Sequence, residues 1–131
     1  MALNFFIKKN STLPILKYPI TDKILTKYDI TSDMLSNCAV TFSLLSADTG
    51  FYHIANVTAE IIYLPDRAKY PNDTEYSLGF SFRKGHLPKS GLYKAEFTID
   101  FLGDYCGSIK LPENDQINVI VIDSITKTDV I

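Results

Sequence analysis

The clearest pattern along the chain is a strict alternation of apolar and polar residues from Gly91 to Phe101. The apolar residues fall at odd positions and the polar ones at even positions: Tyr93, Ala95, Phe97, Ile99 and Phe101 against Lys94, Glu96, Thr98 and Asp100. A helix would spread the five apolar side chains around its circumference. The alternation therefore predicts an antiparallel strand with one buried and one solvent-facing side.

Weaker alternation and turn signals predict further short strands. Pro14 and Pro19 confine the second of these to a sheet edge, because proline cannot donate to a strand ladder. Residues 51–64 predict either a strand pair or one long bent strand. Thr31 or Ser32 is expected to cap a single helical turn over 31–35. The predicted strands cover residues 4–9, 13–20, 39–45, 51–57, 59–64, 76–84, 108–111 and 117–122.

Strands of this length and spacing predict an all-β fold, an immunoglobulin-like antiparallel β-sandwich of about seven to nine strands. The entry Gly91-Leu92-Tyr93 into a late strand is also found in such sandwiches, where the tyrosine hydroxyl bonds the backbone at a corner. We expect one sandwich domain over residues 1–124, with residues 125–131 as a tail or contact arm.

Composition excludes some classes of function. The 131 residues carry a formal net charge of −2 and no basic patch, which argues against nucleic-acid binding. No segment approaches the roughly 20 apolar residues of a membrane span, and no signal peptide is evident. We expect Cys38 and Cys106 to be free thiols, because two cysteines make no disulfide framework.

The residues of catalytic chemistry are sparse. His53 and His86 are the only histidines, and neither has a second ligand at metal spacing. Nothing in the sequence brings Glu60 and Glu96 together as a glycosidase-like carboxylate pair. We therefore expect no enzymatic activity and no cofactor.

Calcium is the one metal that the loop acids could suit. Asp73 with Glu75, or residues 113–115, would supply oxygen ligands within a turn. Solvated turn residues are the simpler interpretation of both groups.

The two ends of the domain carry more apolar residues than one sheet face needs. Phe5 and Phe6 lie in the first strand, and Ile120 and Ile122 lie in the last. Unpaired apolar edges are a liability unless a neighbour covers them. We therefore predict that one of these strands lies at a subunit contact and that these four residues form it.

Tyrosines suggest a second surface. Tyr70 and Tyr76 flank the loop over 71–74 and are weaker candidates for a contact with a partner. Together with Tyr105, they could instead form a sugar-binding platform if their rings were coplanar and exposed. The half-buried tyrosines of any β protein are the simpler interpretation.

The order of these segments resembles a known family. The segments are Phe5 to Pro14, Asp29-Ile30-Thr31, Ala39 to Ser43, the hairpin at Thr49-Gly50, the strand Tyr76 to Phe82, Gly91-x-Tyr93-x-Ala95-Glu96-Phe97 and a closing apolar strand. In this order they are similar to the N-terminal immunoglobulin-like domain of tailed-phage baseplate upper proteins.

The resemblance implies a non-enzymatic structural or adaptor protein of a tailed-phage virion. Its place would be in the baseplate, tail, neck or capsid, after assembly in the bacterial cytoplasm. Its partners would be other virion proteins in multiple copies, including a fibre or receptor-binding protein, with no nucleic acid and no membrane. The alternative is a carbohydrate-binding or adhesion module of similar fold.

Overall fold

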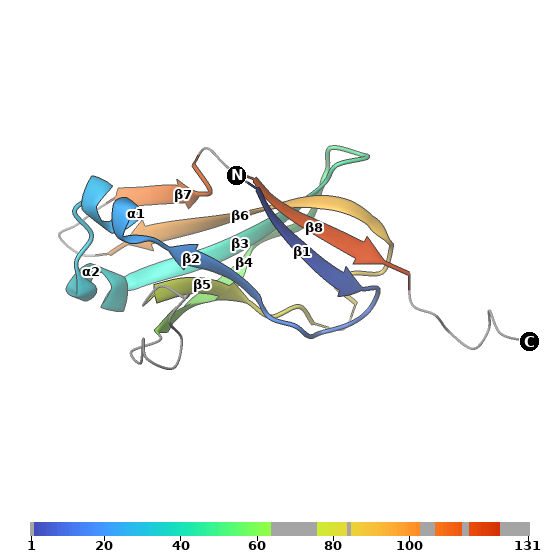
Figure 1. The fold of residues 1–131 in the computed structure, drawn as a ribbon, viewed down its shortest axis with the longest axis horizontal. Coiled ribbons are helices and arrows are strands. Elements are labelled where there is room, and N and C mark those ends of the chain that lie inside the picture. The colour runs from blue at the N-terminus through green and yellow to red at the C-terminus, as the bar shows by residue number, and fades with distance from the viewer. Residues whose placement is uncertain (1, 64–75, 84, 103–106, 114–115, 124–131) are drawn as a thin grey trace, which may run out of the picture.

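The chain forms eight strands and two short helices in the part that the structure describes, a computed structural model covering residues 2–63, 76–83, 85–102, 107–113 and 116–123 (Figure 1). Most elements follow the predicted segments closely. They are β1 (Ala2–Lys8), β2 (Leu16–Ile20), α1 (Asp22–Lys27), α2 (Ser32–Ser36), β3 (Cys38–Ser46), β4 (Tyr52–Tyr63), β5 (Tyr76–Phe80), β6 (Gly91–Phe101), β7 (Gly107–Leu111) and β8 (Gln116–Ile122).

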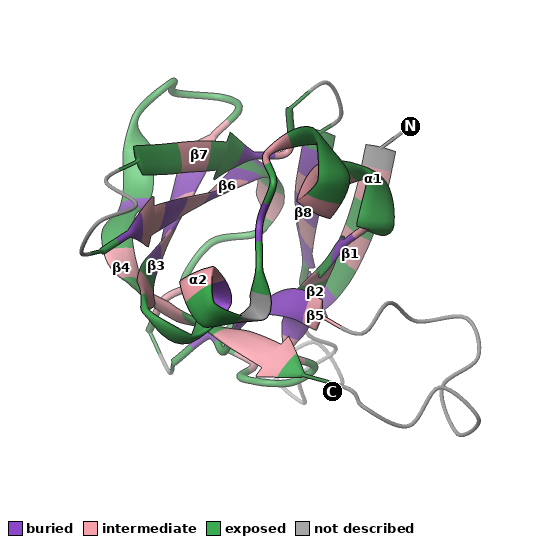
Figure 2. Ribbon diagram, turned by 90° about the vertical axis from the view of Figure 1, so that its left-hand side faces the viewer, coloured by how far each residue is buried: buried purple, intermediate pink, exposed green. Residues whose placement is uncertain are grey.

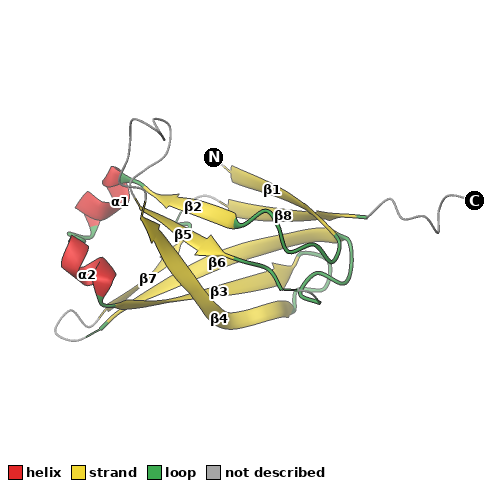
Figure 3. Cartoon of the chain, turned by 90° about the horizontal axis from the view of Figure 1, so that it is seen from below, coloured by secondary structure: helices red, strands yellow, loops and turns green. Residues whose placement is uncertain are grey.

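The predicted two-sheet sandwich is wrong. One mixed sheet runs in the order β1-β8-β6-β3-β4-β5-β2 and curls until it nearly closes into a barrel (Figure 3). β1 pairs with β8 in parallel, and the other pairs are antiparallel. β6 is long enough to pair with β8 along its first half and with β7 along its second. The first and last strands of the sheet are therefore β1 and β2, as the prolines predicted for β2.

The bend that curls the sheet lies in β4. Its pairing with β3 shifts register twice, between Phe42 and Leu44 and again between Leu44 and Leu45. At the first shift, Asn56 adopts a positive φ of 51° and its N–H donates to Ser43 Oγ at 3.0 Å. Bulges of this kind bend a strand and increase its twist. Sequence alternation does not reveal such a bend, which is the physical reason that the sandwich prediction fails.

Side chains of the buried residues, which are purple along the strands in Figure 2, form the core inside this barrel. Phe42 of β3 is fully buried at its centre, with ring centroids 4.1 Å from Phe80 and 5.1 Å from Phe97. Tyr93, Ala95, Phe97, Ile99 and Phe101 of β6 are all buried, as the alternation predicted. A single apolar core therefore joins the strands on all sides.

Two short helices connect β2 to β3. Thr31 caps α2 by accepting from the Met34 N–H, which confirms the predicted turn. α1 was not predicted, because its six residues are too few for a sustained apolar stripe, and Ile24 and Leu25 are only partly buried. Thr21 caps α1 by accepting from the Ile24 N–H. Threonine caps supply acceptors for the free N–H groups of a first turn.

The tyrosine at the entry to β6 makes the predicted corner contact. The Tyr93 hydroxyl donates to the Lys89 carbonyl at 3.0 Å, four residues upstream. Burial, with Asp48 nearby, raises the pKa of Tyr93. The contact fixes the turn into β6 in a barrel-like sheet just as it does in a sandwich.

Candidate docking surface

Large apolar side chains line up on the outside of β1, β8 and β6. Phe6 of β1 pairs with Ile120 of β8, and Ile120 pairs with Leu92 of β6. Phe6 is 57% exposed and Leu92 is 40% exposed, while Ile120 between them is half-buried. We call these three residues the apolar row. Ile122 lies beside it on the same face of β8 and is also exposed.

Polar residues border the apolar row. On one side, Asn118 Nδ2 donates to Asn4 Oδ1 at 3.0 Å, and Lys94 Nζ donates to Gln116 Oε1 at 3.0 Å. On the other side, Lys8 pairs with Ile122 in the register of β1 and β8. An apolar centre with a polar border is the usual composition of a protein–protein interface.

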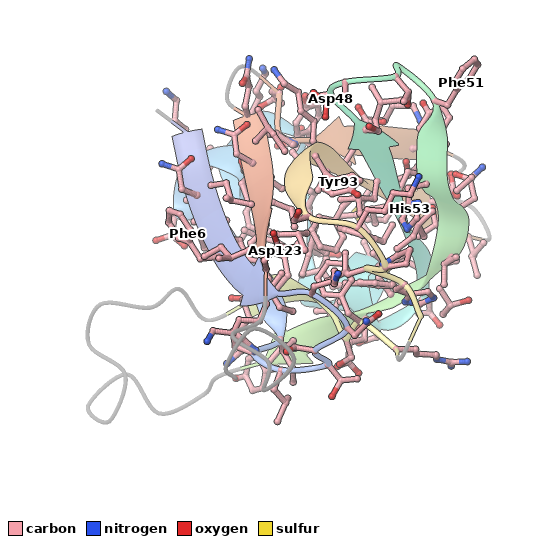
Figure 4. All side chains as sticks on the ribbon, turned by 90° about the vertical axis from the view of Figure 1, so that its right-hand side faces the viewer. Phe6, Asp48, Phe51, His53, Tyr93 and Asp123 are labelled. Atoms are coloured by element: carbon pink, nitrogen blue, oxygen red, sulfur yellow. The ribbon has the colours of Figure 1, made fainter. Side chains whose placement is uncertain are left out.

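Asp123 directly follows β8 and lies near Lys9 of the residues that follow β1. Lys9 Nζ lies 4.0 Å from the carboxylate of Asp123. Figure 4 shows Phe6 on the outer side of β1, with Asp123 at the end of the neighbouring strand.

The structure brings together three of the six contact residues predicted from sequence. Phe6, Ile120 and Ile122 share the outer face described above. Phe5 points to the core instead, with its ring 6.1 Å from that of Phe82. Phe5 therefore lies outside the docking surface.

The predicted tyrosine surface is only partly within the described residues. Tyr76 packs on Tyr63, with ring centroids 5.0 Å apart and planes inclined at 44°. Tyr70 and Tyr105 lie outside the described residues. The sugar platform stays a prediction, although the one described pair is not coplanar.

Sequence reasoning did not single out Leu92 as a contact residue. Its even position in the alternation of β6 already placed it on the outward face with Lys94. What the sequence does not contain is the register that aligns Leu92 with Ile120 and Phe6. That register turns three separate residues into one continuous row.

The two histidines meet in the structure although 33 positions separate them. His53 Nε2 donates to the His86 carbonyl, and His86 Nδ1 accepts from the Arg83 N–H at 2.9 Å. A carbonyl only accepts and an amide N–H only donates, so these partners fix both tautomers. Desolvation, with smaller effects from Arg83 and His53, lowers the pKa of His86. In each of the two rings, one nitrogen is therefore engaged in a hydrogen bond with the backbone.

Three of the acids considered from the sequence are described: Glu113 is hydrogen-bonded, and Glu60 and Glu96 lie on different strands. Glu113 accepts from Lys27 Nζ at 2.6 Å and from the Tyr28 hydroxyl, and these hydrogen bonds lower the pKa of Glu113. Ala59, next to Glu60, shares a row of the sheet with Ile99, three residues from Glu96. Glu60 and Glu96 therefore lie apart, as expected from the sequence.

The acids considered as calcium ligands fall largely on undescribed residues. Asp73, Glu75 and Asp115 lie outside the described residues, so neither the calcium alternative nor the favoured interpretation as solvated turn residues is tested there. Within the described ranges, no group of three or more histidine, cysteine or acidic side chains is placed to hold a metal ion.

Cys38 is a free thiol, as predicted, and its Sγ donates to the Leu35 carbonyl at 3.3 Å. Burial raises the pKa of Cys38, so the thiolate form is less populated at neutral pH. Cys106 lies outside the described residues.

Comparison with known proteins gives no family assignment for this chain. Among the described residues, no helix is long and apolar enough to cross a bilayer. No protein-family model, curated protein or solved structure matches the chain.

Proposed function

We propose that this chain is a non-enzymatic structural or adaptor protein that docks through the apolar row onto another protein subunit. The observation that carries the proposal is the alignment of Phe6, Ile120 and Leu92 across three paired strands on the solvent side of the sheet. Contiguous exposed apolar side chains with a polar rim mark interaction surfaces on proteins of this size.

The rim indicates what kind of subunit fits. Lys8 and Lys94 border the apolar row on opposite sides and are both exposed. In a two-fold contact between copies of this chain, each subunit would present these same two cations to the other. A different protein, with an apolar strip bordered by carboxylates, fits the charges better. Several copies of such a contact would compensate for its small area.

The proposed setting is a tailed-phage virion. Support for it comes from the sequence resemblance, from which the docking role is kept and the sandwich fold is dropped. In that setting the chain would sit between repeated virion subunits and carry a fibre or receptor-binding protein.

The test is quantitative mass spectrometry of gradient-purified virions of the phage that encodes the chain. Particles would be assembled with the unmodified chain, with the double variant Phe6→Ser and Leu92→Ser, or with Phe51→Ser as a matched control. Phe51 is 76% exposed and lies at the β3–β4 turn, away from Phe6 (Figure 4). We expect a stoichiometric signal for the unmodified chain and the control, and a several-fold loss for the double variant.

Circular dichroism and thermal unfolding of the purified variants separate docking from folding. Both substitutions of the double variant are on the solvent side, so its melting curve should match that of the control. Absence of the chain from intact particles would overturn the proposal. Equal incorporation of the double variant would overturn the role of the apolar row.

A further inference from the structure

β4 has an unpaired edge over most of its length. On one side it pairs with β3, whereas on the other it pairs with β5 only from Glu60 to Tyr63. Along Tyr52–Ala59, no described strand pairs with this second edge. Main-chain N–H and C=O groups on such an edge are a template for a further strand.

A cleft of about 380 Å³ lies along part of that edge. Val57 to Glu60 of β4 form one wall, and Gly79, Phe80 and Ser81 form the other, since the two strands separate beyond the pair Glu60–Gly79. Arg83 and His86 also line it. We call this cleft the β4 window.

The wall opposite β4 is held in place. The His86 ring stacks on Phe80, with centroids 5.8 Å apart and planes 24° apart. Its Nδ1 accepts from the Arg83 N–H, and its carbonyl accepts from His53 of β4. His86 is thus tied to both sides of the window, so a ligand would not have to order this residue on binding.

The dimensions of the β4 window match a short strand. Four residues of β4, Val57 to Glu60, line it, and three steps along a strand measure about 10 Å. Gly79 makes room on its wall for the side chain of Ile62, since a Cβ at this position would lie 2.5 Å from Ile62 Cδ1.

Charge selects among possible strands. Arg83 lines the window and is exposed, and its guanidinium has no ion-pair partner within the described residues. Arginine binds carboxylates in a planar, two-pronged geometry.

We infer that the β4 window binds an extended peptide segment of a partner protein. The segment adds as a strand to the free edge at Val57–Ala59 and directs an Asp or Glu side chain to Arg83. This mode of recognition combines main-chain hydrogen bonds with one side-chain contact. It uses none of the residues of the apolar row, so the two proposals can fail independently.

The test is a chemical-shift titration of the ¹⁵N-labelled chain with a blocked peptide, acetyl-Thr-Val-Glu-Val-Thr-amide, at millimolar concentration. We expect shifts centred on Val57, Thr58, Ala59 and Arg83. The same peptide with N-methyl groups on its central residues cannot form strand hydrogen bonds and should bind about tenfold more weakly or less. Exchanging its Glu for Gln should also weaken binding several-fold.

Protein variants complete the test. Ser81→Trp fills the β4 window from an exposed position and should abolish the shifts, whereas Ser90→Trp, exposed but outside the cleft, should keep them. Arg83→Ala should reproduce the loss seen with the Gln peptide.

Four results would overturn the inference: no shifts, shifts centred on another strand edge, equal binding of the N-methylated peptide, or the same shifts with acetate alone.

Discussion

The apolar row and the β4 window lie on the outside of the same sheet but are built in opposite ways. In the row, three strands pair without interruption, so the side chains of Phe6, Ile120 and Leu92 are what a partner meets. In the window, strand pairing stops at Glu60, so the main chain of β4 itself is available. One sheet thus exposes side chains at one place and backbone at another, and substitutions can separate the two proposed contacts.

Phe42→Ala removes what the two surfaces share. Phe42 packs between Phe80, beneath the β4 window, and Phe97 of β6, so its loss leaves a cavity at the centre of the core. We expect a loss of about 3–5 kcal/mol in the free energy of unfolding, measured by urea denaturation. Both surfaces should weaken together. Phe51→Ala, at an exposed position, should change the free energy by no more than about 0.5 kcal/mol, and a similar loss in both variants would contradict this account of the core.

Asn56→Val should affect the window more than the row. Asn56 holds a positive φ at the bulge of β4, a conformation that costs a β-branched residue about 1–2 kcal/mol. Asn56→Gly tolerates that φ and is the matched control. Urea denaturation gives the free energies, and peptide titration should show weaker binding for the valine variant alone. Equal stability of the two variants would mean that the bulge does not depend on the backbone preference of residue 56.

The smallest expected effect is a dependence of folding stability on pH that arises from His86 at the window. Burial lowers the pKa of His86 below its ordinary value of 6.5, so the unfolded chain binds this proton more readily than the folded one. Stability from His86 is therefore complete above about pH 6.5 and declines as the pH falls through that value toward the folded-state pKa.

Thermal unfolding between pH 7.5 and 5.5 measures this decline. His86→Asn keeps an acceptor for the Arg83 N–H but does not titrate, so its melting temperature should fall less over the same range. If the two proteins lose stability in parallel, His86 is not the group responsible.

Sequence alone predicted the strands better than their arrangement. The alternation of β6 identified which of its residues face the core, and it would have placed Leu92 outside as well. Closure of the sheet depends on two register shifts in β4 and on parallel pairing of β1 with β8, and neither leaves a periodic signal. The same limit applies to the surfaces, since the row needs the register of three distant strands and the window is defined by where pairing ends.

The parallel pairing of β1 with β8 also determines when the docking surface comes into existence. Among the described strands, β1 comes first in the chain, but its only strand neighbour, β8, comes last. Contacts between such distant segments form slowly and late in folding. Phe6 therefore acquires its neighbour Ile120 only after β8 has emerged and joined the sheet. A chain interrupted before β8 would lack Ile120 and the pairing that joins Phe6 to Leu92, so a partner that needs the whole row would bind only chains in which β8 has joined the sheet.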